Sequence, residues 1–84
     1  MLNNKTLLLT GGTGSFGKKC VEEILKRYPR IKKLIIFSRD ELKQHEMSLQ
    51  YPNKKFPNLR FFLGDIRDKN ILYSALEGVD FVIH

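Results

Sequence analysis

The stretch Thr6-Leu-Leu-Leu-Thr-Gly-Gly-Thr-Gly-Ser-Phe-Gly17 decides the fold. Its first part, Thr6–Thr10, is an apolar run that is too short for a helix. The run is continuous rather than alternating, which is typical of a strand buried on both faces of a parallel sheet. Glycines follow at once and mark a tight loop. We therefore predict a buried strand that leads through a glycine-rich loop into the next element.

A helix follows this loop. Apolar side chains recur there with helical spacing, and lysines and glutamates occupy the positions between them. The predicted stripe contains Phe16, Cys20, Ile24 and Tyr28, widened by Val21 and Leu25. Pro29 is expected to end the helix, because proline cannot continue the hydrogen-bond ladder.

The rest of the chain repeats this alternation. Apolar runs predict further strands at Leu34–Phe37, Leu59–Leu63 and Phe81–Ile83. A second helix is expected after Ser38, which has capping-box spacing to Glu41, with a thin apolar side made of Leu42, His45 and Leu49. A third helix should begin after the N-cap Asp68 and end near Gly78, with an inward side made of Ile71, Leu72, Ala75 and Leu76.

The order β-α-β-α-β-α-β predicts an α/β protein with a Rossmann-type doubly wound parallel sheet. No helix follows the apolar run Phe81–Ile83 to cover it. We therefore interpret residues 1–84 as the incomplete N-terminal portion of a domain that continues beyond His84.

Composition restricts the function classes. With 84 residues the chain has room for one small domain, and its only cysteine, Cys20, excludes an internal disulfide. Cys20, His45 and His84 are too few for a Cys/His zinc site, so we expect no metal. No apolar run is long enough to cross a membrane. The net charge of +6 favours an anionic partner. A chain without an internal disulfide is typical of a reducing compartment, so we expect a cytoplasmic protein.

The glycine loop indicates which anion that is. Gly12, Gly14 and Gly17 form the pattern G-x-G-x-x-G directly after a strand and before a helix, which is the context of a dinucleotide-binding loop. The alternative is a plain turn, but four glycines within residues 11–17 exceed what a turn needs. A P-loop is excluded, because no Gly-Lys-Ser/Thr ends the motif.

The end of the second strand bears on cofactor choice. NAD-binding proteins carry an acidic residue there for the ribose, whereas this chain has Ser38-Arg39, with Asp40 slightly later. Arginine suits a 2′-phosphate, so we expect NADP, with Lys43 as a second cation; the alternative is that Arg39 is a solvated loop residue. Asp65, after the third strand, is expected to accept a hydrogen bond from the adenine amino group.

These motifs resemble those of a known family. The loop Thr10–Gly17 resembles the cofactor loop of extended short-chain dehydrogenases/reductases. Together with Leu34–Met47 and Phe62–Asp68 it is similar to the start of the inverting UDP-N-acetylglucosamine 4,6-dehydratases, in the CapD-like polysaccharide biosynthesis group. The resemblance implies pyrophosphate contacts from the loop, ribose and 2′-phosphate contacts from the second strand end, and adenine contacts after the third strand: respectively Gly11, Thr13, Gly14, Ser15, Phe16 and Gly17; Ser38, Arg39, Asp40 and Lys43; Asp65 and Ile66.

The resemblance also implies a reaction. NADP oxidises the sugar at C4, water leaves across C5 and C6, and the hydride returns to C6 with inversion at C5. This chemistry uses a Tyr and a Lys one helical turn apart. Tyr28 with Lys32 and Tyr51 with Lys55 have this spacing, but a proline follows each tyrosine. We therefore expect no catalytic residue in this chain and no activity from residues 1–84 alone.

Other functions stay open. A nucleotide-sugar epimerase or reductase has the same cofactor half, and a non-catalytic dinucleotide-binding module is a different class. A nucleic-acid-binding domain is suggested by the basic cluster Lys26, Arg27, Arg30, Lys32 and Lys33 beside Tyr28, although a solvated helix end and loop is the better explanation of this cluster. Our interpretation has a nucleotide-sugar substrate, no nucleic-acid or membrane partner, and a homo-oligomer for the full-length protein.

Overall fold

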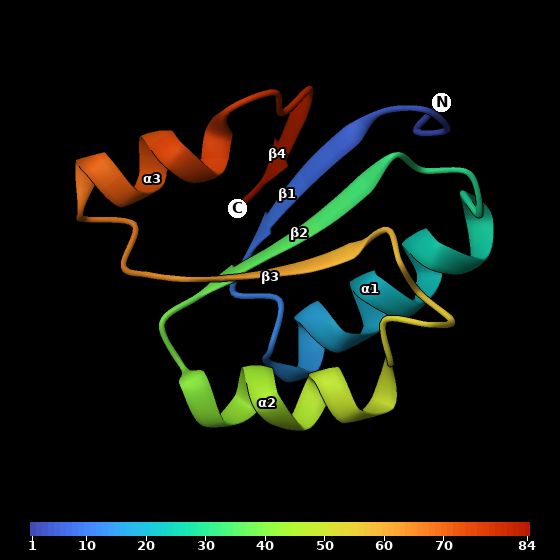
Figure 1. Ribbon diagram of the computed structural model, residues 1–84, viewed down its shortest axis with the longest axis horizontal. Helices are drawn as coiled ribbons and strands as arrows, with labels where there is room; N and C mark the ends of the chain where they lie inside the picture. The colour runs from blue at the N-terminus through green and yellow to red at the C-terminus, as the bar shows by residue number, and fades with distance from the viewer.

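The structure is a computed structural model that describes residues 1–84. Four strands alternate with three helices: β1 (Thr6–Thr10), α1 (Ser15–Arg27), β2 (Lys33–Ser38), α2 (Glu41–Gln50), β3 (Leu59–Leu63), α3 (Lys69–Leu76) and β4 (Phe81–Ile83). The strands form one parallel sheet in the order β3-β2-β1-β4 (Figure 1). This is the strand order of the first part of a Rossmann-type sheet, so the predicted fold class is confirmed.

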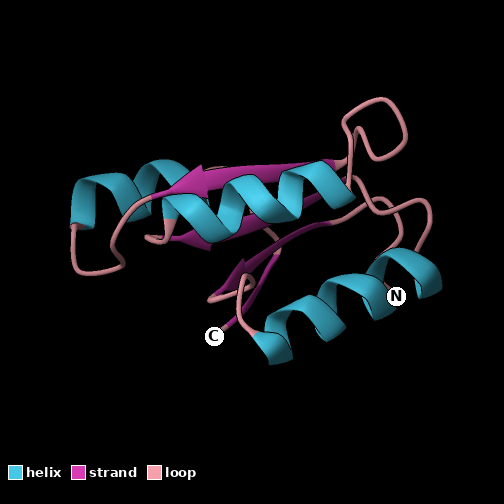
Figure 2. Ribbon diagram, turned by 90° about the horizontal axis from the view of Figure 1, so that it is seen from below, coloured by secondary structure: helices cyan, strands magenta, loops and turns pink.

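The sheet has a helical layer on each face (Figures 1 and 2). Leu7 and Leu9 of β1 share a core cluster with residues of α1 and α2, among them Val21 and Met47. Leu8, between them in sequence, points to the opposite face and shares a second cluster with Ala75 of α3. The continuous apolar run of β1 is therefore explained by burial on both faces.

Helix α1 ends at Arg27, before Pro29, as predicted, and it buries Gly17, Val21 and Ile24. The prediction that Phe16 belongs to its inward stripe is wrong, because this side chain is 78% exposed. The first turn meets the preceding loop through Gly17. Phe16, one position and about 100° earlier around the helix, therefore points to solvent.

Helix α2 does not begin with the predicted capping box of Ser38 and Glu41. Its N-cap is Asp40, whose carboxylate accepts the Lys43 N–H at 3.0 Å. Ser38 is still the last residue of β2 and pairs with Leu63 of β3. Because strand pairing fixes the backbone of Ser38, the helix starts later than the spacing suggests.

The inward side of α2 also differs from the prediction. Leu42 and Leu49 are 66% and 69% exposed, and His45 is exposed as well; Gln44 and Met47 are buried instead. The Gln44 side-chain amide donates to the backbone carbonyls of Ser38 at 3.2 Å and Phe62 at 3.1 Å. These two bonds fasten the Gln44 face of α2 to the ends of β2 and β3.

Helix α3 leads into β4, the last strand of the chain to join the sheet. Asp68 is the N-cap of α3, as predicted, and Gly78 follows its end with φ +75°, a conformation that favours glycine. Strand β4 pairs with β1 along Phe81–Ile83. Its three side chains are 46%, 51% and 36% exposed, in chain order, so α1, α2 and α3 leave both faces of β4 open.

Candidate functional site

A cleft of about 590 Å³ opens at the carboxyl ends of the strands. Its walls come from the segments that follow β1, β2 and β3, together with His84 after β4. Doubly wound sheets bind ligands at this edge, near the point where the strand order reverses. The cleft brings together some of the predicted cofactor residues, namely Gly11, Ser38, Arg39, Asp65 and Ile66.

The glycine loop lies against the start of α1 with almost no space between them. A Cβ on Gly17 would lie 2.4 Å from the Gly12 Cα and 2.6 Å from the Gly11 carbonyl oxygen. Gly11 itself has φ +68°, which favours glycine. The lack of a side chain at Gly17 therefore lets the start of α1 pack directly against the loop backbone.

The N-terminus of α1 is open to an external acceptor. Its N-cap is Gly14, which makes no side-chain cap, and the first turn holds no acidic residue. The Lys18 N–H is the first of the helix to bond, to the Gly14 carbonyl at 2.8 Å, and the N–H groups of Ser15, Phe16 and Gly17 have no acceptor within the chain. Free N–H groups at the positive end of a helix dipole suit a phosphate, so this loop fits a dinucleotide.

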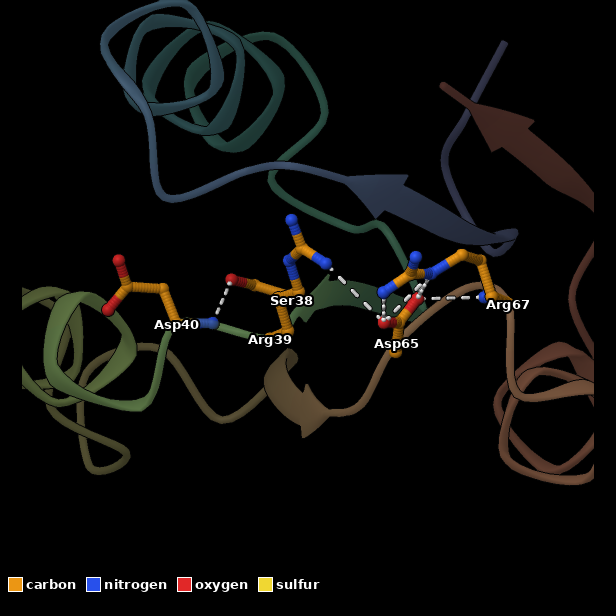
Figure 3. A network of polar contacts seen from close by, with 5 residues as sticks. All are labelled: Ser38, Arg39, Asp40, Asp65 and Arg67. Atoms are coloured by element: carbon orange, nitrogen blue, oxygen red, sulfur yellow. Dashed lines mark hydrogen bonds and ion pairs between the residues drawn. The ribbon is translucent and has the colours of Figure 1, made fainter.

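Ser38 connects the glycine loop to the start of α2. Its hydroxyl lies 3.3 Å from the Thr13 hydroxyl and accepts the Asp40 N–H at 3.0 Å. Both Thr13 and Ser38 are buried. Figure 3 shows the bond between Ser38 and Asp40. The Asp40 carboxylate also caps α2, so Thr13, Ser38 and Asp40 hold the cleft wall in place through contacts within the chain.

An ion-pair network lies on the rim of the cleft (Figure 3). The Asp65 carboxylate accepts from Arg67 Nη2 at 2.8 Å and from Arg67 Nε at 3.2 Å, and Arg39 Nη1 approaches it to 3.4 Å. The hydrogen bonds from Arg67 lower the pKa of Asp65 far below its usual range, and Asp65 in turn raises the pKa of Arg67. Both arginine side chains stay more than two-thirds exposed, at 72% for Arg39 and 78% for Arg67.

The other predicted cofactor residues lie outside the lining of the cleft. Most belong to the glycine loop and the first turn of α1, and two belong to the start of α2: Thr13, Gly14, Ser15, Phe16, Gly17, Asp40 and Lys43. Asp40 is occupied as a cap, and the Lys43 side chain is exposed. Their cofactor contacts stay predictions.

Sequence reasoning gave no role to several residues that line the cleft. Thr10, at the end of β1, bonds to the His84 ring at 2.8 Å, and Arg67 holds Asp65. Gly64 packs tightly, since a Cβ there would lie 2.5 Å from Ile71. The sequence could have predicted that Thr10 and Gly64 lie at the cleft, because the carboxyl ends of parallel strands meet at one edge of the sheet and both residues lie at such an end.

Neither of the two tyrosines with a lysine four residues later, Tyr28 and Tyr51, lines the cleft. Tyr28 and Tyr51 follow the last residues of α1 and α2, and Tyr51 packs edge-on against Phe56 with ring centres 5.0 Å apart. Burial, with a smaller effect of Glu22, raises the pKa of Tyr51. A raised pKa keeps the Tyr51 hydroxyl protonated at neutral pH, whereas a tyrosine that acts as a general base must be ionised.

The structure contains neither a group of metal ligands nor a membrane-spanning helix. No three His, Cys, Asp or Glu side chains gather as metal ligands would. None of the helices combines the length and the hydrophobicity that crossing a bilayer needs. The cytoplasmic location stays a prediction.

Curated relatives resemble the chain along its whole length. The inverting UDP-N-acetylglucosamine 4,6-dehydratase of Campylobacter jejuni serotype O:2 is 51% identical over 84 residues, and the UDP-glucose 4-epimerase of Rickettsia bellii is 45% identical over 86. Each match covers 100% of this chain, which spans 24% of the relative's length. The resemblance to inverting dehydratases noted from the motifs is confirmed.

Solved structures share the fold. Pen from Bacillus thuringiensis superposes with a TM-score of 0.88 at 34% identity, covering 99% of this chain and 25% of that one. The dTDP-glucose 4,6-dehydratase of Bacillus anthracis, solved with NAD, gives 0.77 at 24% identity over 93% of this chain and 25% of its own. The NADPH-bound carbonyl reductase from chicken fatty liver gives 0.72 at 23% identity over 96% and 36%. The last two likenesses concern the fold alone.

A family model also matches most of the chain. It is described as "Polysaccharide biosynthesis protein" and matches residues 7–84, from β1 through β4. These residues include the glycine loop and every segment that lines the cleft. The chain belongs to the polysaccharide biosynthesis protein family.

Proposed function

We propose that this chain is the NADP-binding part of an inverting UDP-N-acetylglucosamine 4,6-dehydratase. A relative of that name is 51% identical along the whole chain. The observation that carries the cofactor choice is an exposed arginine, Arg39, at the cleft-facing end of β2, next to an uncapped glycine loop. The same proposal includes a nucleotide-sugar substrate, a homo-oligomeric protein and a cytoplasmic location.

The glycine loop would hold the pyrophosphate. The N–H groups of Ser15, Phe16 and Gly17 are free, and the helix dipole adds a partial positive charge behind them. A Cβ on Gly14 would meet only the Gly11 carbonyl oxygen, at 3.8 Å, so the loop leaves open space where a phosphate can approach the backbone.

Arg39 would favour NADP over NAD. In NAD-binding proteins a carboxylate at the end of β2 accepts the ribose 2′-hydroxyl. Here the carboxylate nearest in sequence, Asp40, already bonds to the Lys43 N–H, whereas the Arg39 guanidinium has a single contact, to Asp65. An exposed arginine at this position suits a 2′-phosphate.

Within the reaction, this part of the protein would bind and orient the cofactor. A nicotinamide bound there would supply hydride transfer to and from the sugar. The Tyr and Lys that remove the C4 hydroxyl proton would come from outside these 84 residues, because Tyr28 and Tyr51 both lie away from the cleft.

The cofactor choice can be tested with Arg39→Ala in the complete protein. NADP affinity should fall about 10-fold to 100-fold, since a charge-assisted hydrogen bond contributes roughly 1.5–3 kcal/mol, whereas NAD affinity should stay unchanged. Isothermal titration measures both. Arg30→Ala, which removes a positive charge from an exposed loop outside the cleft, is the control. Equal losses for the two cofactors would contradict the assignment of Arg39.

The reaction class has a separate test. The 45% identity to UDP-glucose 4-epimerases makes epimerisation the second candidate. Chromatography coupled to mass spectrometry, applied to UDP-N-acetylglucosamine treated with the complete protein, separates the two reactions from each other and from unreacted substrate. A dehydratase gives a product lighter by one water, whereas an epimerase gives an isomer of equal mass. Cofactor binding without any turnover would favour a non-catalytic dinucleotide-binding module.

A further inference from the structure

Asp65 stands between two arginines that it holds very differently. Arg67 donates to both carboxylate oxygens from its side chain and adds its backbone N–H at 2.9 Å. Arg39 makes one contact, from Nη1 to Oδ2 at 3.4 Å. Oδ1 therefore belongs to Arg67 alone, and Oδ2 is shared (Figure 3). Arg67 is the principal partner of Asp65, and Arg39 is the secondary one.

This inequality matters because Asp65 competes with any anion for Arg39. Arginine and carboxylate groups commonly form bidentate pairs, so Asp65 would hold Arg39 in such a pair if no other cation neutralised it. With Arg67 bound, the negative charge of Asp65 is largely balanced. Arg39 is then held by one long contact and remains 72% exposed on the rim of the cleft.

We infer that Arg67 is a positioning residue for cofactor specificity: by occupying Asp65, it leaves Arg39 available to a 2′-phosphate. This inference rests on the proposed NADP-binding function. Arg67 itself needs no contact with the cofactor. Without it, Asp65 captures Arg39 and repels the phosphate, so the preference for NADP over NAD declines.

The test is the ratio of NADP to NAD affinity in the complete protein carrying Arg67→Met, measured by titration. We expect the ratio to fall about threefold to fivefold, the upper end of what a surface ion pair contributes. The Arg67 side chain is 78% exposed, so the fold should stay intact with only a small loss of stability, and a thermal unfolding curve checks this. Arg67→Lys keeps the charge without the paired contacts and should restore part of the ratio. Arg30→Met controls for net charge.

A double-mutant cycle separates positioning from a general effect. In an Arg39→Ala background, Arg67→Met should leave the ratio unchanged, because no arginine remains to be captured. In an Asp65→Asn background it should also have no effect, because the competing charge is gone. A ratio unchanged by Arg67→Met alone, or an effect that persists in either background, overturns the role of Arg67. A wild-type protein without preference for NADP overturns the proposed function as well, and so the two failures are distinguishable.

Discussion

The three helices begin at the same edge of the sheet, but their N-termini are finished in two different ways. Helix α2 follows Asp40, whose carboxylate accepts the Lys43 N–H at 3.0 Å, and α3 follows Asp68, whose carboxylate accepts the Ile71 N–H at 3.3 Å. Helix α1 follows Gly14 and has no side-chain cap. An aspartate cap stabilises a helix by about 1 kcal/mol relative to alanine and by a few tenths of that relative to glycine. Helix α1, with Gly14 at its N-cap, therefore lacks a contribution that both other helices have.

The difference concerns chemistry as well as stability. An aspartate at the start of α1 would occupy the free N–H groups and place a negative charge where the proposed pyrophosphate binds. Glycine leaves both the N–H groups and the space open. The comparison therefore separates two helix starts that carry an aspartate cap from one whose N–H groups are free for the proposed pyrophosphate.

The largest effect on stability is expected where α1 touches the loop. Gly17→Ala places a Cβ 2.4 Å from the Gly12 Cα, and the neighbouring atoms are backbone, which cannot move aside cheaply. Overpacking of this kind costs up to about 3 kcal/mol, which exceeds the roughly 1 kcal/mol that alanine gains over glycine within a helix. We expect a net loss of about 2 kcal/mol in chemical denaturation, together with weaker NADP binding. Gly14→Ala, which has space for its Cβ, is the matched control, and equal stability of the two variants would contradict the close packing at Gly17.

Gly14→Asp tests the comparison directly by giving α1 the cap of its neighbours. Gly14 has φ −78° and ψ 177°, which any residue can adopt, and an aspartate there would cap the Gly17 N–H, three residues on, as Asp40 and Asp68 do. We expect the free energy of unfolding to rise by about 0.5 kcal/mol. NADP affinity should fall about 100-fold or more, because at least two charge-assisted hydrogen bonds are lost.

Stability and binding should therefore change in opposite directions. Gly14→Asn supplies a cap without the charge and should weaken NADP binding less than Gly14→Asp does. Titration and chemical denaturation of the same samples measure both quantities. Undiminished NADP affinity in Gly14→Asp would show that the free N–H groups of α1 do not hold the pyrophosphate.

Asp68→Ala removes a cap from a helix start that serves the fold alone. We expect a loss of about 1 kcal/mol in chemical denaturation and no change in NADP affinity, since Asp68 does not line the cleft. Asp68→Asn keeps a capping oxygen and should retain most of the stability. If NADP binding weakened as strongly as in Gly14→Asp, the distinction between the two kinds of helix start would fail.

The features that the sequence predicted well are local. The apolar runs place all four strands, and Pro29, Asp68 and Gly78 mark helix ends through their own backbone or side-chain chemistry. The glycine loop was recognisable because its spacing and its place after a strand are both written in consecutive residues.

The features that the sequence missed depend on contacts between distant segments. Gln44 faces inward, where its side-chain amide donates to the carbonyls of Ser38 and Phe62, and periodicity within α2 does not reveal these partners. The contact of Arg39 with Asp65 also joins distant segments, because the two residues are 26 positions apart and follow different strands. Which arginine holds Asp65 more closely is decided by the path of the loop after β3.

The smallest expected effect concerns Asp65, in the loop that leads to the capped helix α3. Hydrogen bonds from Arg67 hold its folded-state pKa below the ordinary aspartate value of about 3.9. Ionised Asp65 therefore stabilises the fold above about pH 4, and this contribution declines progressively as the pH falls further toward the folded-state pKa. In Asp65→Asn the side chain cannot ionise. The wild type should unfold at a slightly higher temperature than this variant at pH 7, and the difference should shrink below about pH 4. Because the pair is exposed, added salt should reduce the difference at pH 7 as well. Thermal unfolding of both proteins across this range measures the effect, and a difference that stays constant down to about pH 3 would show that ionised Asp65 does not stabilise the fold.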